Sequence, residues 1–251
     1  MIFILDQTND LKEEFFKIKK MGWVKSVRKG SGGVGRTFEY LLGKEEENFE
    51  IPDYNGIEIK TKRLSSLYET SLFNARPDGK YFHEIERLRD EYGYLDSFSK
   101  KYKVLNFTVS SNRITYVRSG FAFKLRIDKY KQKIFLCVFD HFGNLIEDFV
   151  YWDFDTLEEK LYRKLRLLAF IKASRRFING VEYFHYTEMK LYSLKSFDMF
   201  INLVEQGKIM IKIEIGVFRS GKRKGQIHDH GTTFAIKECD LLYLYNLHSS
   251  K

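Results

Sequence analysis

The sequence predicts a mixed α/β protein whose middle is dominated by β-strands. Amphipathic helical segments at both ends of the chain flank a run of short apolar segments that are dense in Phe, Tyr, Val and Ile and separated by turn residues. Hydrophobic residues make up 43% of the chain and aromatic residues 16%, which is enough apolar mass for a packed core. A length of 251 residues fits one large domain or two smaller lobes.

The N-terminal part is expected to hold two helices and then a strand. Residues 8–20 form an amphipathic helix, and a glycine-rich stretch at 30–35 leads into a second helix at 34–42. Gly43 ends this helix, because glycine readily adopts a left-handed backbone. Alternation of side chains over residues 56–62 predicts a strand. The inward side of the first helix is expected to comprise Leu11, Phe15, Phe16 and Ile18.

The rest of the chain is expected to be mostly strands with a few helices, and no Ser/Gly/Pro-rich linker interrupts it. Helices are predicted at 81–91, 155–165, 195–206 and 238–246. Strands are predicted at 103–110, 113–117, 121–127, 133–139, 147–152, 167–172, 181–187, 208–218 and 232–236.

Charge and composition limit the classes of function. Lys and Arg number 43 against 34 Asp and Glu, for a net charge of +9, which fits a polyanionic partner such as nucleic acid and a merely solvated basic surface about equally well. Two cysteines are too few for a disulfide-stapled scaffold. The longest apolar run, residues 134–139, is too short to cross a bilayer, and the N-terminus lacks the features of a signal peptide. We therefore expect a soluble, cytoplasmic protein without a membrane partner.

The glycine-rich stretch permits a nucleotide-binding interpretation. Residues 30–35 satisfy G-x-G-x-x-G and nearly satisfy a P-loop, in which Arg36 replaces the lysine. Both motifs require a buried apolar strand directly before the glycines, whereas residues 25–29 carry three basic side chains. Nucleotide binding is therefore a less favoured alternative. A loop that caps the next helix, or one whose amides approach a nucleic-acid phosphate, explains the same residues.

The segment from Pro52 to Lys60 carries the most informative pattern. In a strand, Glu58 and Lys60 project from one face, and Asp53 can turn back towards Glu58 across an Asn-Gly bend. Two converging carboxylates form an oxygen site suited to Mg²⁺. The nearby lysine can then orient or help deprotonate a water, or neutralise charge on a phosphate. An exposed strand with an incidental Glu/Lys pair is the alternative. Glu39, at the edge of the apolar stripe of the preceding helix, can supply a third carboxylate.

These residues resemble the MvaI/BcnI family of type II restriction endonucleases, relatives of the nicking enzyme MutH in the PD-(D/E)xK nuclease superfamily. The resemblance is carried by Gly33 to Gly43, by Pro52-Asp53-Tyr54 and by Gly56 to Lys62. It implies a PD-(D/E)xK core in a two-lobed MutH-like clamp around DNA. It also implies Asp53 and Glu58 as Mg²⁺ ligands, Lys60 as the catalytic lysine and Glu39 as an additional carboxylate.

The family resemblance further implies a monomer that cuts both strands of DNA at a short CCNGG-type site. A cognate DNA methyltransferase is expected as a genetic rather than a physical partner. We expect residues 1–110 to form the catalytic lobe and residues 111–251 the remaining sheet and the DNA-recognition lobe. The alternatives are a MutH-like nickase, the nucleotide-binding protein described above, and a non-catalytic DNA-binding module. The last is disfavoured because every catalytic position is kept.

A glycine-bounded basic loop between two predicted strands, residues 216–236, is the candidate for reading DNA. It mixes Arg, His and Asp, which suits recognition of G·C pairs in the major groove, and it resembles the family motif H-D-H-G-T-x-F. A solvated loop is one alternative. A zinc site of the His-x-His pair with Cys239 is another, but it lacks a fourth ligand. The residues expected to contact DNA are Lys62, Arg219, Lys222, Arg223, Lys224, His228, Asp229 and His230.

Overall fold

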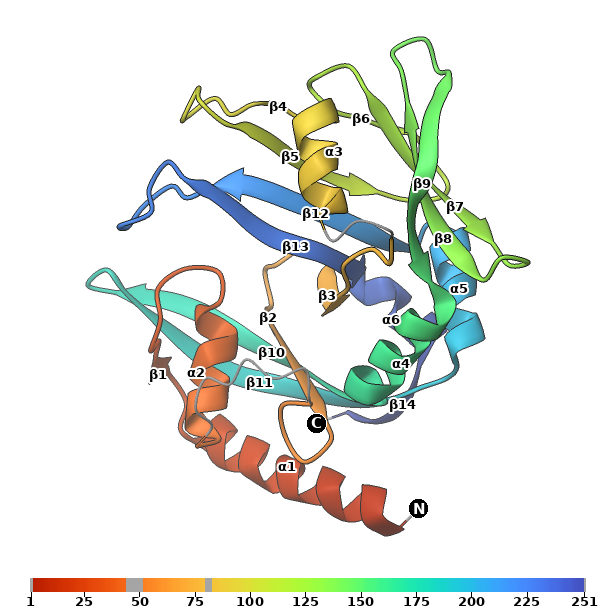
Figure 1. Ribbon diagram of the computed structural model, residues 1–251. Coiled ribbons are helices and arrows are strands. Elements are labelled where there is room, and N and C mark those ends of the chain that lie inside the picture. Colours follow the sequence, from red (N-terminus) through yellow and green to blue (C-terminus); the bar gives the residue numbers. More distant parts are fainter. Residues whose placement is uncertain (1, 44–51, 80–82, 251) are drawn as a thin grey trace. The chain divides into compact units, whose positions relative to one another are not determined.

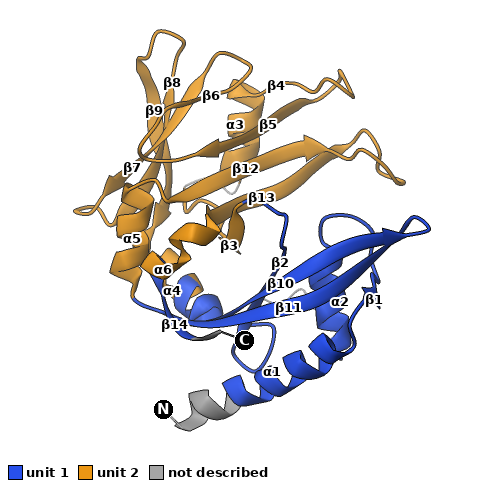
Figure 2. Ribbon diagram, turned by 180° about the vertical axis from the view of Figure 1, so that it is seen from behind, with its two compact units in different colours: residues 1–68, 161–195, 244–251 blue, residues 69–160, 196–243 orange. Residues whose placement is uncertain are grey.

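The computed structural model describes residues 2–43, 52–79 and 83–250 (Figure 1), with side chains for 8–43, 52–79 and 83–248. The chain divides into two compact units (Figure 2), the first made of residues 1–68, 161–195 and 244–251 and the second of residues 69–160 and 196–243. This division does not follow the expected boundary near residue 110. Residues 161–195, from the second half of the chain, and the C-terminal segment belong to the first unit, because their strands pair within its sheet.

The first unit is a five-stranded sheet with helices. Its strands run in the order β1-β11-β10-β2, and β14 also pairs with β11. Among the described strands of this sheet, β2 and β10 pair in parallel and the other pairs are antiparallel; the parallel pairing places Glu58 opposite Leu168 and Lys60 opposite Phe170. The elements are α1 (Ile2–Lys20), β1 (Val24–Lys25), α2 (Gly33–Leu41), β2 (Glu58–Arg63), the second part of α4 (Phe154–Leu165), β10 (Leu167–Ile178), β11 (Val181–Leu194) and β14 (Tyr245–Ser250).

The core of the first unit lies between one face of this sheet and helices α1 and α2. Leu11, Phe15 and Ile18 are buried as predicted, but Phe16 is 38% exposed, so its predicted inward position is wrong. The buried residues recur at i, i+4 and i+7, and a helical step of about 100° carries the residue after Phe15 away from that stripe. Gly43 follows α2 with φ 75°, which confirms it as the residue that ends the helix.

The second unit contains two sheets, in the orders β3-β13-β12-β5-β4 and β6-β7-β8-β9. Buried aromatic rings form much of its core: Phe234 stacks on Phe73 at 5.1 Å and meets Trp152 edge-on at 6.0 Å. The strands are β3 (Thr70–Asn74), β4 (Tyr94–Leu95), β5 (Lys103–Val109), β6 (Thr115–Tyr116), β7 (Ala122–Asp128), β8 (Lys133–Phe139), β9 (Leu145–Asp153), β12 (Ile209–Val217) and β13 (Ile227–Ile236). The helical elements are α3 (Glu84–Tyr92), the first part of α4, α5 (Phe197–Glu205), the 3₁₀ turn Glu238–Asp240 and α6 (Leu241–Leu244).

The mixed α/β class with a β-rich middle is confirmed, and most predicted elements occur. The predicted helix at 238–246 is wrong in extent: a 3₁₀ turn and a four-residue helix give way to β14 at Tyr245, because that segment pairs with β11. The start of the helix expected at 81–91 falls partly outside the described residues, and α3 begins at Glu84. Within the described ranges, no helix has the length and apolarity of a membrane span.

Candidate active site

A tight turn places the first carboxylate of the predicted motif. Tyr54 and Ile57 exchange two backbone hydrogen bonds, of 2.9 and 2.7 Å, around Asn55 (φ 44°) and Gly56 (φ 80°). This confirms the predicted bend, since both central residues of such a turn need a left-handed backbone. The Tyr54 hydroxyl donates to Asp10 Oδ2 on α1 at 2.7 Å. Burial, reinforced by this hydrogen bond, raises the pKa of Tyr54 to about 12. Helix α1 therefore fixes the turn that follows Asp53.

The structure brings Asp53, Glu58 and Lys60 together at the start of β2. Asp53 Oδ2 accepts the backbone N–H of Ile59 at 2.8 Å, which holds this carboxylate against the strand. Lys60 Nζ donates to Glu58 Oε1 at 2.5 Å. Ile57 and Ile59 are buried on the opposite face, as the alternation predicted.

Glu58 is buried more deeply than the sequence indicates, with 2% of its side chain exposed. Burial raises the pKa of Glu58, and the charge of Asp53 adds to this effect, whereas Lys60 and Lys164 oppose it. Glu58 Oε2 has no hydrogen-bond partner among the described residues. A buried carboxylate oxygen without a partner is costly, and a divalent cation, which prefers carboxylate oxygens, would satisfy it. Asp53 and Glu58 therefore fit a hard metal ion.

Glu39 lies on helix α2, whereas Asp53 and Glu58 lie on strand β2 and the turn before it. Arg36 Nη1 is 3.5 Å from Glu39 Oε2, and the described residues include no group of three or more acidic, histidine or cysteine side chains arranged to hold a metal ion. A Cβ at Gly35 would lie 3.1 Å from Thr61 Oγ1 and 3.8 Å from Glu39 Oε1. Gly35 thus lets α2 approach β2 closely. The role of Glu39 as a third carboxylate stays a prediction.

Close packing also explains the glycine-rich stretch. A Cβ at Gly33 would lie 2.5 Å from the carbonyl oxygen of Arg28, so only glycine fits there. Gly30 accepts a hydrogen bond from Arg63 at 2.8 Å through its carbonyl oxygen. The strand before the glycines, β1, has two residues and pairs antiparallel with β11. It differs from the buried parallel strand that a nucleotide-binding fingerprint requires, so the fold does not favour that alternative.

The predicted DNA-contacting loop joins β12 to β13 in the second unit. Arg219 makes a two-pronged ion pair with Asp96, at 2.7 and 3.1 Å, although 57% of the arginine side chain is exposed. Asp96 is itself buried and accepts the backbone N–H groups of Phe98 and Ser99. Burial would raise the pKa of Asp96, but these donors and Arg219 outweigh it and lower the pKa. The other basic residues of the loop, Lys222, Arg223 and Lys224, are exposed.

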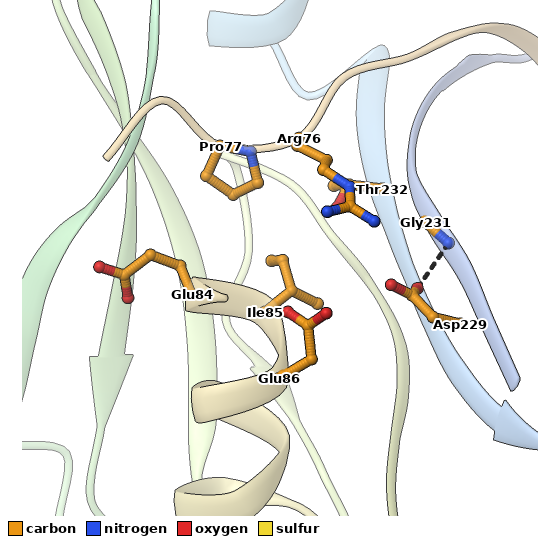
Figure 3. Close-up of a pocket in the computed structure, with 8 residues that line it drawn as sticks. All are labelled: Arg76, Pro77, Glu84, Ile85, Glu86, Asp229, Gly231 and Thr232. Atoms are coloured by element: carbon orange, nitrogen blue, oxygen red, sulfur yellow. Dashed lines mark hydrogen bonds between the residues drawn. The ribbon is translucent and has the colours of Figure 1, made fainter. Parts of the chain in front are cut away.

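The two histidines of the loop's H-D-H motif lie close together, with their rings tilted by 50°. His228 packs face to face on Phe218 at 3.8 Å and lies 3.7 Å from the ring of His230. Burial, with repulsion from His230 and Arg223, lowers the pKa of His228. Asp229 Oδ1 accepts the backbone N–H of Gly231 at 2.7 Å. Asp229 also lines a small pocket (Figure 3), together with Arg76, Pro77, Glu84, Ile85, Glu86, Gly231 and Thr232.

Sequence reasoning missed three residues near these sites. Lys164, in the last turn of α4, lies 3.7 Å from Glu58 Oε1 through its Nζ. Asp10 supports the turn at Tyr54, and Asp96 holds Arg219. None of them lies in a recognisable motif, and each is distant in sequence from the residue that it contacts. Lys62 lies on β2, on the same face as Glu58 and Lys60 by the alternation of the strand.

Comparison with known proteins agrees with this geometry. The model of the MvaI/BcnI restriction endonuclease family matches residues 12–245. Among solved structures, the chain resembles a complex of restriction endonuclease MvaI with its cognate DNA substrate, at 37% identity over 96% of each chain, with a TM-score of 0.90. It also resembles MvaI in the absence of DNA, at 36% identity over 96% of each chain, with a TM-score of 0.61. No curated protein matches the sequence. The chain therefore belongs to the MvaI/BcnI family of restriction endonucleases and is a site-specific deoxyribonuclease.

Proposed function

We propose that this enzyme uses Mg²⁺ to cut both strands of DNA at a short CCNGG-type site, acting as a monomer. The observation that carries the proposal is the grouping of Asp53, Glu58 and Lys60 at the start of β2, with one oxygen of Glu58 buried and without a partner among the described residues. The similarity to MvaI bound to its cognate DNA supports double-stranded DNA as the substrate.

Each residue of this group has a separate task in the proposed reaction. Asp53 and Glu58 would hold Mg²⁺, which supplies Lewis acidity at the reacting phosphate. Lys60 orients the attacking water, and its ion pair with Glu58 fixes the position of its ammonium group. The water oxygen bonds to phosphorus and the water gives up a proton, while the bond from phosphorus to the 3′ oxygen breaks and that oxygen takes up a proton from solvent. The products are a 5′-phosphate and a 3′-hydroxyl.

The loop between β12 and β13 is proposed to read the base pairs. Arg219 and His228 can donate to guanine, and Asp229 can accept from cytosine. The exposed lysines of the loop, and Lys62 on β2, contact phosphates. We also propose a cytoplasmic location. Because such an enzyme would cut the DNA of its own host cell, we propose a cognate DNA methyltransferase as a genetic partner.

Digestion of a randomised plasmid library tests the proposal. With Mg²⁺, the wild-type enzyme should produce ends that share one CCNGG-type motif and carry 5′-phosphates, and sequencing them identifies the central base pair. The Lys60→Ala enzyme serves as the control for contaminating nucleases. Ends without a common motif would contradict the proposed specificity. Products nicked in one strand only, with activity that rises on addition of a repair protein, would favour the MutH-like alternative.

A further inference from the structure

Lys164 reaches the candidate active site from an element that carries none of the motif. It lies in the last turn of α4, in the part of the helix that belongs to the first unit. Leu161 and Leu165, one turn apart, are fully buried and anchor this turn. Lys164 follows Leu161 by three residues and therefore projects from nearly the same side of the helix. Its Nζ lies 3.7 Å from Glu58 Oε1.

Two lysines thus share one carboxylate oxygen at unequal distances. Lys60 Nζ is hydrogen-bonded to Glu58 Oε1 at 2.5 Å, whereas Lys164 Nζ, at 3.7 Å, is beyond hydrogen-bonding range. The described part of the chain gives Lys164 no hydrogen-bond acceptor, and 28% of its side chain is exposed. An ammonium group has three N–H donors, so Lys164 is able to bind an acceptor that arrives from solution.

The charge of the site indicates what this acceptor is. Asp53 and Glu58 suit a cation, and one lysine is enough to orient a water. A second ammonium group beside them weakens the binding of a cation by repulsion, so a metal site alone does not account for Lys164. An anionic reactant does account for it. The phosphate of DNA is negative, and further negative charge develops on it during cleavage.

We propose that Lys164 is a second catalytic lysine, which donates a hydrogen bond to a non-bridging oxygen of the scissile phosphate. This inference rests on the proposed phosphodiester cleavage at Asp53, Glu58 and Lys60. In that step the attacking water loses a proton to solvent as its oxygen bonds to phosphorus, and the 3′ oxygen leaves with the bonding electron pair and takes a proton from solvent. Lys164 transfers no proton. It stabilises the charge on the phosphate oxygen.

Single-turnover cleavage of a DNA duplex carrying the enzyme's site tests the first consequence. Lys164→Ala should slow the cleavage step 10- to 100-fold, while DNA affinity measured by fluorescence anisotropy without a divalent ion changes less than threefold. Lys20→Ala is the matched control, because it removes the same charge from an exposed position at the end of α1. Lys164→Met, which keeps the apolar stem, should behave like Lys164→Ala. Thermal unfolding measures whether each variant is folded.

Phosphorothioate substrates test the contact itself. Sulfur replaces one non-bridging oxygen of the scissile phosphate in either the Rp or the Sp configuration, and each isomer slows the wild-type enzyme by its own factor. In Lys164→Met, the factor for one isomer should fall at least threefold, because the lost hydrogen bond no longer distinguishes oxygen from sulfur. The factor for the other isomer should stay unchanged. Lys20→Ala should change neither.

The outcomes separate this inference from the proposed function. If the wild-type enzyme does not cleave DNA, the proposed function fails and the inference fails with it. If the wild-type enzyme cleaves and folded Lys164→Met cleaves at the same rate, only the inference is overturned. A slow variant with both sulfur factors unchanged also overturns it, because Lys164 then acts only by positioning Glu58.

Discussion

At Glu58, a carboxyl group is buried beside a second carboxylate and is held there by lysine side chains. Removing one member of this group should stop the reaction without preventing DNA binding. We expect Asp53→Ala, Glu58→Ala and Lys60→Ala each to lower the cleavage rate by on the order of 10³-fold or more, because these groups act on the transition state. Gel-shift affinity in the absence of divalent ions should stay close to the wild-type value. Full activity of Lys60→Ala would contradict the assignment, and Glu39→Ala should have a smaller effect.

The raised pKa of Glu58 also predicts a dependence of stability on pH in the metal-free protein. Because the folded protein holds this proton more tightly than the unfolded chain, the stabilisation is complete below the ordinary value of 4.5 and is lost as pH rises through the raised value. A tenfold difference in proton affinity between the two states corresponds to about 1.4 kcal/mol. The free energy of unfolding of wild type relative to Glu58→Gln should therefore decrease as pH rises above 4.5. Exposed Glu13→Gln is the control, and a pH-independent difference between wild type and Glu58→Gln would contradict the expectation.

At the scale of elements, the ion pair between Asp96 and Arg219 ties the loop after β4 to the loop between β12 and β13. If Arg219 reads a base, Asp96 orients it, so both Arg219→Ala and Asp96→Ala should reduce discrimination against a site with one changed base pair. We expect a loss of about 1–3 kcal/mol for each variant in competitive cleavage assays. Equal losses of affinity for all sequences would show that the pair only anchors the loop.

Exposed Lys222, in the same loop, should behave differently from Arg219. A lysine that contacts only phosphate contributes to binding of every sequence through counterion release. Lys222→Ala should therefore weaken binding to cognate and non-cognate duplexes alike, and reduce the slope of log affinity against log salt by about one. Titrations at several salt concentrations measure this slope. A change confined to the cognate duplex would instead assign base reading to Lys222.

Local patterns predicted most of the elements but not their partners. The Asn55-Gly56 turn and the alternation of β2 place Asp53, Glu58 and Lys60 from short-range geometry alone, so this part of the site follows from the sequence. Strand β14 and the contact of Lys164 with Glu58 depend on pairing and packing between distant segments. The side-chain periodicity of one segment does not identify such contacts, because they depend equally on the distant segment that pairs or packs with it.

At the scale of the whole molecule, the chain contributes a single Asp53-Glu58-Lys60 group, whereas a duplex presents two scissile phosphates. A monomer must therefore cut one strand, reorient and then cut the other. Supercoiled plasmid with one site should pass through a nicked intermediate before it becomes linear, and the nicked fraction should rise and fall as the digestion proceeds. Agarose gels of a time course measure these species, and sedimentation at the same enzyme concentration measures the oligomeric state. Direct conversion to linear DNA by a stable dimer would contradict the monomeric mechanism, because a dimer carries a second active site to the other strand.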